Sequence, residues 1–359
     1  MTNIEYMAKP PIITTLIPTF QRATLLERAI RSALGQTYPH LQVCVYDNGS
    51  GDDTEETVRQ LSSADQRVKY FCHATNIGLQ KNFIQAMERV DTPFFSFLSD
   101  DDVLLPRFYE TALEGFKNHP EAIMSATTTL RMNEAGIIAG APLLKWKPGL
   151  YQPPDGFLSM LDNGHPDWTG VVFRQDVIHK AGVLDEETGA PSDLDYLLRV
   201  AANFPIVVST KLGAILVSHP GSYSITPNVF TSPGWLKMIE NQTKDERVPI
   251  WVRARARTVL TKQYIQRIFM TNGFHSIIDR RWHNSQEAAY VLRCDHGLWI
   301  RASVLSAASW ACENLPFAHG ALLTIYAVRR LLTRFKQRLL QRQFKSYASY
   351  LRICAPNVN

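Results

Sequence analysis

The residues best suited to chemistry are three consecutive carboxylates, Asp100, Asp101 and Asp102. Adjacent carboxylates repel one another unless a positive charge lies between them. Mg²⁺ and Mn²⁺ prefer carboxylate oxygens and often share them with substrate phosphates. The three residues therefore predict a divalent metal site. On this loop alone the alternative is a solvated acidic turn at the start of a helix, where Asp is favoured by capping and by the helix dipole.

The elements around these carboxylates are readable from the sequence. Residues 94–98, FFSFL, predict a strand buried on both faces, and Pro106 suits the first turn of a following helix. The same strand–helix alternation precedes them, with strands expected at 12–18, 42–46 and 68–72 and helices at 25–34, 52–61 and 79–89, before a helix at 106–117. This alternation predicts a parallel, doubly wound sheet whose carboxyl ends meet at one edge. Asp47, Asn76 and the three carboxylates are then expected in one crevice.

The pattern changes after Glu121. We expect strands at 123–130, 169–173, 206–209 and 214–218, a helix at 176–181 and a helix starting at Ser192 or Asp193, with loops and short pieces over 131–167. From about residue 232 only helical periodicity is visible, over 234–272, about 285–313 and 318–352. A separate helical extension is therefore expected.

The amino-acid composition limits the class of protein to which the chain can belong. The chain has 359 residues, is 45% hydrophobic and 20% charged, and carries a net charge of +5, which is typical of a globular protein. Its five cysteines are scattered, so a disulfide framework or zinc site is not expected and a reducing compartment fits. We see no signal peptide and no long apolar segment, and expect a cytoplasmic protein that does not bind nucleic acid.

The C-terminal part has an unusual charge pattern. After Glu313 the sequence has no acidic residue. Basic and apolar residues alternate there, the basic ones being Arg329, Arg330, Arg334, Lys336, Arg338, Arg342, Lys345 and Arg352. This pattern predicts a basic amphipathic helix on an anionic membrane surface. The alternative is a helix that packs on the body of the protein or on a second copy, as in a homo-oligomer.

Four motifs together resemble the family 2 glycosyltransferases with the GT-A fold: residues 17–22 (IPTFQR), 28–38 (RAIRSALGQTY), 45–50 (VYDNGS) and 99–102 (SDDD). The resemblance covers about residues 11–225. It implies an α/β, Rossmann-like, mostly parallel sheet flanked by helices, followed by a C-terminal α-helical extension that it does not cover. The expected domains are 1–230, with a nucleotide-sugar half at 11–120 and an acceptor half at 121–230, and a helical region at 231–359.

The resemblance also implies a nucleotide-diphospho-sugar donor and a divalent metal, Mn²⁺ or Mg²⁺. Asp101 is expected to be the main metal ligand, with Asp102 and His219 as further candidates. Asp100 is placed near the ribose or the metal. The remaining nucleotide-sugar residues are Pro18, Thr19, Arg22, Asp47, Asn76, Gly78 and Lys81.

On the acceptor side, a hydroxyl that attacks an anomeric carbon must lose its proton. The register of residues 192–199, SDLDYLLR, makes Asp193 the expected base, with Ser192 where the family often has Glu. Trp168, Asp167 and Asp195 are candidate acceptor residues, although a core position suits Trp168 equally well. The expected acceptor is a saccharide or lipid-linked saccharide.

Two departures refine this expectation. Asn48 replaces the second Asp of the usual Asp-Asp-Gly-Ser motif, and Ile278 stands where processive members have Gln before Arg281-Trp282. We therefore expect an enzyme that adds one sugar, in surface polysaccharide or other glycoconjugate synthesis. Inversion is expected because the sequence offers one base and no separate nucleophile. The alternatives are a sugar-phosphate nucleotidyltransferase, which the lack of glycine in residues 19–23 disfavours, and a non-catalytic scaffold of the same fold.

Overall fold

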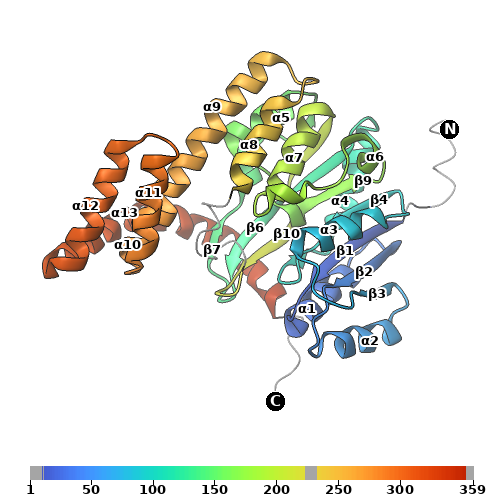
Figure 1. Ribbon diagram of the computed structural model, residues 1–359. Helices are drawn as coiled ribbons and strands as arrows, with labels where there is room; N and C mark the ends of the chain where they lie inside the picture. The colour runs from blue at the N-terminus through green and yellow to red at the C-terminus, as the bar shows by residue number, and fades with distance from the viewer. Residues whose placement is uncertain (1–9, 11, 223–232, 353–359) are drawn as a thin grey trace. The chain divides into compact units, whose positions relative to one another are not determined.

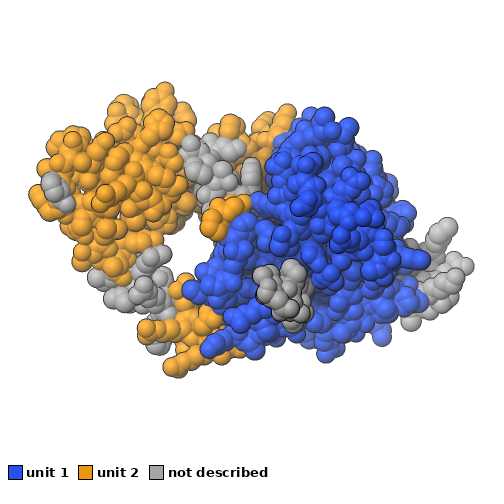
Figure 2. All heavy atoms as spheres, turned by 90° about the horizontal axis from the view of Figure 1, so that it is seen from below, with its two compact units in different colours: residues 1–186, 192–219, 344–359 blue, residues 187–191, 220–343 orange. Residues whose placement is uncertain are grey.

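The computed structural model describes residues 10, 12–222 and 233–352, without the side chains of residues 316 and 328–336. The described chain divides into two compact units, which Figure 2 shows in two colours. Unit 1 comprises residues up to 186 together with 192–219 and the segment from 344. Unit 2 comprises residues 187–191 and 220–343.

The first half of unit 1 follows the expected alternation. Its elements are β1 (Ile13–Thr19), α1 (Ala23–Leu34), β2 (Leu41–Asp47), α2 (Thr54–Ala64), β3 (Val68–Cys72), α3 (Leu79–Glu88), β4 (Phe94–Phe97), β5 (Val103–Leu104) and α4 (Phe108–Asn118). The two-residue strand β5 was not expected. Pro106 was expected inside the first helical turn, but α4 begins at Phe108, and Pro106 lies in the turn before it.

The second half of unit 1 differs more from expectation. It contains β6 (Met124–Asn133), β7 (Ile138–Gly140), β8 (Gly149–Tyr151), α5 (Asp155–Asn163), β9 (Val171–Arg174), α6 (Val177–Ala181), α7 (Ser192–Asn203) and β10 (Ile206–Ser218). The helix α5 lies where loops were expected, and Trp168–Gly170 form a 3₁₀ turn rather than the start of a strand. The strands expected at 206–209 and 214–218 are one strand, with irregular register between Val208 and Ala214.

The strands of unit 1 form one sheet in the order β3-β2-β1-β4-β9-β6-β10-β5, with β7 and β8 at its margin (Figure 1). β1, β2, β3 and β4 are mutually parallel, and β10 is parallel to β6. β9 pairs antiparallel with both β4 and β6, and β5 pairs antiparallel with β10. Six of the eight strands in this order therefore run the same way, and the expected α/β, mostly parallel sheet is confirmed.

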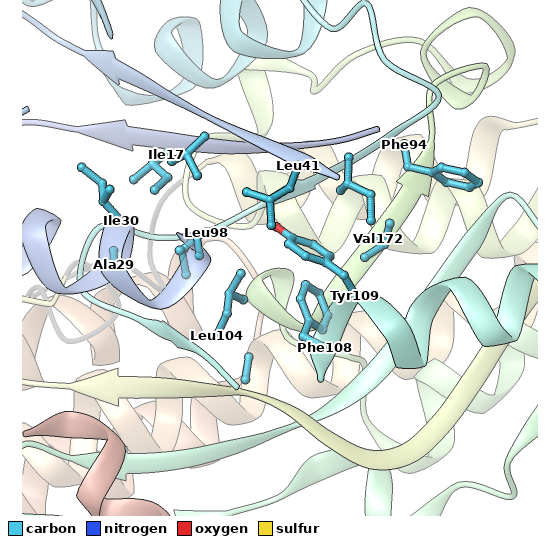
Figure 3. Packing of buried hydrophobic residues seen from close by; sticks show 14 of the residues in the cluster. Ile17, Ala29, Ile30, Leu41, Phe94, Leu98, Leu104, Phe108, Tyr109 and Val172 are labelled. Carbon is cyan, nitrogen blue, oxygen red and sulfur yellow. The ribbon is translucent and has the colours of Figure 1, made fainter. Parts of the chain in front are cut away.

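Alternating strand residues build a core on each face of this sheet. One core gathers Ile17, Ala29, Ile30, Leu41, Phe94, Leu98, Leu104, Phe108, Tyr109 and Val172 (Figure 3). There α1 presents Leu26, Ala29, Ile30 and Ala33, whose spacing places them on one helix face. Phe97 points to the other face, where its ring lies 5.1 Å from that of Phe83 on α3. Helices thus cover both faces and leave the strand ends to form a site.

Unit 2 is helical. It contains α8 (Gly234–Lys244), α9 (Ile250–Arg267), a π-helical segment Ile268–Phe274, α10 (His275–Ile278), α11 (Trp282–Cys294), α12 (Trp299–Asn314) and most of α13 (Pro316–Phe344). The 3₁₀ segment Lys345–Leu351 belongs to unit 1, where Ala348 approaches Gly136. The helical periodicity read from the sequence is confirmed. The side chains of Arg329, Arg330, Arg334 and Lys336 lie outside those that the structure describes.

Candidate active site

The site lies where β1, β2, β3 and β4 end. The register places Thr19 beside Asp47 and Asp47 beside Cys72, so the carboxyl ends of three parallel strands are level. The loop after β1 is held to the loop after β2, because the backbone N–H of Gln21 donates to Ser50 Oγ at 2.9 Å. Gln21 takes a left-handed backbone conformation (φ 55°), which is uncommon for a residue other than glycine and often marks a functional loop. The loops after β1 and β2 therefore lie side by side at this edge of the sheet.

The three carboxylates of the acidic loop point in different directions. Asp100 faces the loop after β1: Thr19 Oγ1 donates to its Oδ2 at 2.8 Å, and Arg22 donates to its Oδ1 at 3.1 Å. Burial, together with the neighbouring charge of Asp101, raises the pKa of Asp100 to about 6. An added cation beside Asp100 would lower this pKa.

Asp101 faces His219. Its Oδ2 lies 3.0 Å from His219 Nε2 and 3.3 Å from an Nη atom of Arg22. Its backbone carbonyl accepts a hydrogen bond from the guanidinium of Arg28, a buried residue of α1. Asp101 is therefore fixed by its main chain while its carboxylate faces a second group able to bind a metal.

Asp102 is turned away from the other two carboxylates. Its Oδ1 accepts the backbone N–H of Val217 on β10 at 2.9 Å, and its Oδ2 accepts the hydroxyl of Thr169. Burial and the charge of Asp101 raise its pKa. Because both oxygens already have protein donors, this geometry favours a role in fixing the loop over a role in binding a metal.

Asp47 is equally well bonded. Its Oδ1 accepts the backbone N–H of Ser50 at 2.9 Å and the hydroxyl of Ser50 at 2.6 Å, and its Oδ2 accepts the hydroxyl of Tyr70 at 2.6 Å. The side chain is buried. Asp47 therefore holds the turn after β2 in place, and any contact that it makes with a nucleotide would use the lone pairs that remain.

Asn48 ties this turn to the loop after β3. Its Nδ2 donates to Asn76 Oδ1 at 2.9 Å, and its Oδ1 accepts the backbone N–H of Ile77 at 2.8 Å. Asn76 Oδ1 also accepts the N–H of Gly78 at 2.9 Å. Between the loops Gly49 has φ 73°, and a Cβ there would lie 2.8 Å from the carbonyl carbon of Thr75, so glycine is required.

Two of the other residues assigned to the nucleotide pocket lie near these loops. Pro18 is the penultimate residue of β1 and is buried. Lys81, on the first turn of α3, is exposed and lies 3.5 Å from Glu186. The buried Asn82, next to it, holds α3 to the sheet by donating to the carbonyl of Tyr46 at 2.8 Å.

Asp193 lies in the first turn of α7, with Oδ1 accepting the backbone N–H of Leu194 at 2.7 Å. Burial raises its pKa, the nearby charge of Asp167 raises it further, and the positive charge of His165 lowers it. A carboxyl group with a raised pKa is a stronger base than an ordinary Asp. The expected base is therefore in an environment suited to that role.

Asp167 connects this region to β6 and to the acidic loop. Thr129 and the guanidinium of Arg131, both from β6, donate to its carboxylate. Its charge also raises the pKa of Asp102 on one side and of Asp193 on the other. The charge of Asp167 thus acts both on the acidic loop and on Asp193.

Sequence reasoning missed Thr129, Arg131 and His165 around Asp193. One signal was available: Thr129 lies on a mostly buried strand, and Arg131 follows two residues later on the same face. Polar side chains at such positions need a polar partner, and for these two the partner is Asp167.

The two other acceptor candidates are core residues. Trp168 is buried, its ring stacked on Phe97 at 4.9 Å and edge-on to Tyr196 at 5.9 Å. Asp195 is fully buried on α7 and pairs with Arg199 of the next turn at 3.4 Å. Both support the helix and loop that carry Asp193 and Asp167.

Two features of the described residues bear on the ligands that they could bind. Within them, no three His, Cys, Asp or Glu side chains gather closely enough to hold a metal by themselves. The pair Asp101 and His219 fits a site of the Mg²⁺ or Mn²⁺ type, in which one or two protein ligands act together with substrate phosphates. Among the helices described, none combines the length and apolar composition needed to cross a membrane.

Known proteins are similar to this chain in sequence and in fold. Residues 14–182 match the family model Glycosyl transferase family 2. A GalNAc(5)-diNAcBac-PP-undecaprenol beta-1,3-glucosyltransferase from Campylobacter jejuni is 35% identical over 105 residues, which are 29% of this chain and 34% of that protein. The chain spans about a third to two fifths of the length of the first curated relatives that it matches.

Two solved structures are similar in fold. S. aureus TarS 1–349 in complex with UDP-GlcNAc superposes with a TM-score of 0.60 at 14% identity and covers 86% of this chain and 87% of its own. The mannosyltransferase PcManGT from Pyrobaculum calidifontis, in complex with GDP-Man and Mn²⁺, has a TM-score of 0.54 at 15% identity and covers 98% and 90%. Over residues 14–182 the chain is therefore similar to the family 2 glycosyl transferases, and its fold is the GT-A fold.

Proposed function

We propose that this protein is an inverting, metal-dependent glycosyltransferase that moves one sugar from a nucleotide-diphospho-sugar to an acceptor hydroxyl. The observation that carries the proposal is the line of carboxylates from the acidic loop to Asp193. Asp101 faces His219 at one end, and Asp167 links Asp102 electrostatically to Asp193 at the other. Such a line would suit a site that holds a diphosphate at one end and activates a hydroxyl at the other.

The donor would lie on the loops after β1, β2 and β3. Arg22 and Thr19 would position its phosphates and ribose together with Asp100, with which both already interact. Asp101 and His219 would hold the divalent cation, Mn²⁺ or Mg²⁺. When bound, that cation supplies positive charge against the developing charge of the departing nucleoside diphosphate.

The acceptor would lie against α7. Asp193 removes the proton from the acceptor hydroxyl as the oxygen attacks the anomeric carbon, and the bond to the nucleoside diphosphate breaks on the opposite side. One base and one displacement give inversion at that carbon. Asp102, bonded to Thr169 and Val217, would keep the acidic loop in register with this half of the site.

Two observations support a proposal for the class of acceptor. The Campylobacter jejuni relative is named for a polyprenol-linked saccharide, and the C-terminal sequence is basic and amphipathic. We therefore propose a saccharide or lipid-linked saccharide acceptor in surface polysaccharide synthesis, and a protein located peripherally at the cytoplasmic face of a membrane. Deleting residues 318–359 should then reduce binding to anionic vesicles, and unchanged binding would refute the role of this segment.

A thermal-shift screen tests the proposed donor site. UDP, GDP, CDP and dTDP would each be added with Mn²⁺, Mg²⁺ or EDTA, because a ligand that binds only the folded state raises the melting temperature. We expect one nucleotide to give a shift that requires metal. Asp101→Ala should abolish the metal-dependent part, whereas Asp193→Ala should retain it and abolish transfer. If no nucleotide gives a shift, the chain is better described as a non-catalytic member of the fold.

A further inference from the structure

Helix α12 of unit 2 has an inverted distribution of apolar residues. Its buried side consists of Ala302, Leu305 and Ser309, which are small or of moderate size. Its large apolar residues face outward: Trp299 is 63% exposed, Ile300 82%, Val304 48% and Trp310 60%. A helix that served only to pack against its neighbours would bury these four side chains.

The buried side of α12 is fixed by close packing. A Cβ on Gly273, in the π-helical segment, would lie 2.5 Å from Leu305 Cδ2, so Leu305 fills the space above that glycine. α11 lies along α12, as Figure 1 shows. Rotation of the helix to bury its tryptophans would break this packing. The outward orientation of the four side chains therefore belongs to the fold.

The four large apolar residues of α12 define one uncharged face. At about 100° per residue, Trp299, Ile300, Val304 and Trp310 fall within an arc of roughly 140°. The other residues on that arc are Ser303, Ala307, Ala311 and Asn314, none of which is charged. Arg301 and Glu313, which are also exposed, flank the arc on its two sides. Contiguous exposed apolar residues of this kind mark an interaction surface.

The helical unit that carries this face has a basic sequence. Its residues 250–343 contain 15 Lys and Arg but 4 Asp and Glu, although the whole chain has a net charge of +5. The remainder of the chain is therefore acidic on balance. Close to the face, the guanidinium of Arg293 lies 5.2 Å from the centre of the Trp299 ring. Apolar and tryptophan side chains bordered by arginines are complementary to a membrane surface that carries negative charge.

We propose that the outward face of α12, formed by Trp299, Ile300, Val304 and Trp310, binds the surface of an anionic lipid bilayer. The indole rings would lie at the level of the headgroups and the neighbouring arginines would contact lipid phosphates. α12 has 16 residues and is about 24 Å long, shorter than the hydrocarbon core of a bilayer, so it would lie on the membrane. A second copy of the chain is the less favoured partner, because two strongly basic regions repel each other.

The test uses the full chain with the double variant Trp299→Ser/Trp310→Ser. The matched control is Trp251→Ser, which removes a tryptophan of similar exposure (58%) from α9. Flotation with vesicles of phosphatidylcholine and phosphatidylglycerol measures binding, and vesicles of phosphatidylcholine alone provide the neutral comparison. We expect the parent and the control to bind anionic vesicles, and the double variant to bind at least tenfold more weakly with an unchanged circular dichroism spectrum.

Three outcomes would overturn the inference. They are a parent that does not bind anionic vesicles, a double variant that binds as well as the parent, and a control that loses binding equally. A dimer that becomes monomeric in the double variant, with vesicle binding unchanged, would assign the face to a second copy. The inference does not depend on the proposed chemistry, because nucleotide-induced thermal shifts should be the same in all three proteins. If no nucleotide raises the melting temperature of any of the three proteins, the proposed chemistry is refuted, while the proposal for the membrane face is unaffected.

Discussion

His219 Nε2 lies 3.0 Å from Asp101 Oδ2, across 118 positions of the chain. Asp101 follows β4 and His219 follows β10, so the contact forms only when both parts of the sheet are complete. If the two side chains share a metal, His219→Ala should weaken nucleotide affinity at least tenfold in Mn²⁺ and leave it unchanged in EDTA. Titration calorimetry under both conditions measures this. His219→Gln, which keeps a polar atom near the Nε2 position, should retain part of the affinity, and an equal loss in EDTA would contradict a metal role.

Asp102 should behave as a structural residue. Asp102→Ala leaves the buried N–H of Val217 and the hydroxyl of Thr169 without their acceptor, which costs about 2–4 kcal/mol in the free energy of unfolding. Asp102→Asn keeps one acceptor for Val217 and a donor for Thr169, so its cost should be much smaller. Urea denaturation measures both. Equal stability of the two variants would show that the two hydrogen bonds do not hold the loop.

Asp193→Asn should abolish transfer and stabilise the protein. Burial raises the pKa of Asp193 in the folded state, so its ionisation opposes folding as the pH rises through that pKa. Asn carries no charge, so the variant should melt at a higher temperature than the parent at pH 8, and the difference should vanish near pH 4. Melting curves at the two pH values measure the effect. A lower melting temperature at pH 8 would show that the carboxylate is stabilising.

Two neighbours of Asp193 should shift the pH profile of transfer in opposite directions. The reaction requires ionised Asp193, so the rate falls as the pH falls through its pKa. The charge of His165 lowers this pKa and that of Asp167 raises it. His165→Gln should therefore move the acid limb to higher pH and Asp167→Asn to lower pH. Initial rates between pH 4 and 9 test this, and a common direction for both variants would exclude Asp193 as the group observed.

Asn48→Asp, which restores the second Asp of the family motif, should lower the stability of this chain. In Asn48→Asp, a carboxylate oxygen would face Asn76 Oδ1. Rotation of the Asn76 amide would relieve that repulsion but would remove the acceptor of the Gly78 N–H. Either way one hydrogen bond is lost, at about 0.5–1.5 kcal/mol. Thermal unfolding and nucleotide titration measure the cost, and Asn48→Ser supplies a shorter, uncharged comparison. A gain in stability would mean that the loop rearranges.

The sequence predicted the nucleotide half of unit 1 well because its signals are local. Each helix has an apolar stripe and each strand a short apolar segment, and parallel strands joined by helices must end at one edge. The roles within the acidic loop were not readable in this way. Asp100, Asp101 and Asp102 are chemically identical, and the partner of each comes from a distant part of the chain.

The acceptor half was harder to predict for a physical reason. Residues 209–213, STKLG, look like a turn between two strands, but β10 continues through them. Gly213 permits this, because a Cβ there would lie 2.1 Å from Thr127 Oγ1 and 2.7 Å from the Phe108 ring. A glycine that ends a strand and one that allows another strand to approach look the same in a sequence. α5 was missed because its nine residues follow two prolines.

The antiparallel strand β9 bears on the order in which the chain becomes structured. β4 pairs with β9 and β5 with β10, so strands of the first 118 residues find their partners between residues 171 and 215. During synthesis, β4 therefore leaves the ribosome long before β9. Until about 80 more residues have followed, the edge of β4 that pairs with β9 is hydrophobic and exposed. A fragment that ends near residue 120 should aggregate rather than bind nucleotide, whereas one that ends near residue 219 would hold every strand of the sheet. Duplication or exchange of this module in evolution would have to carry both halves together.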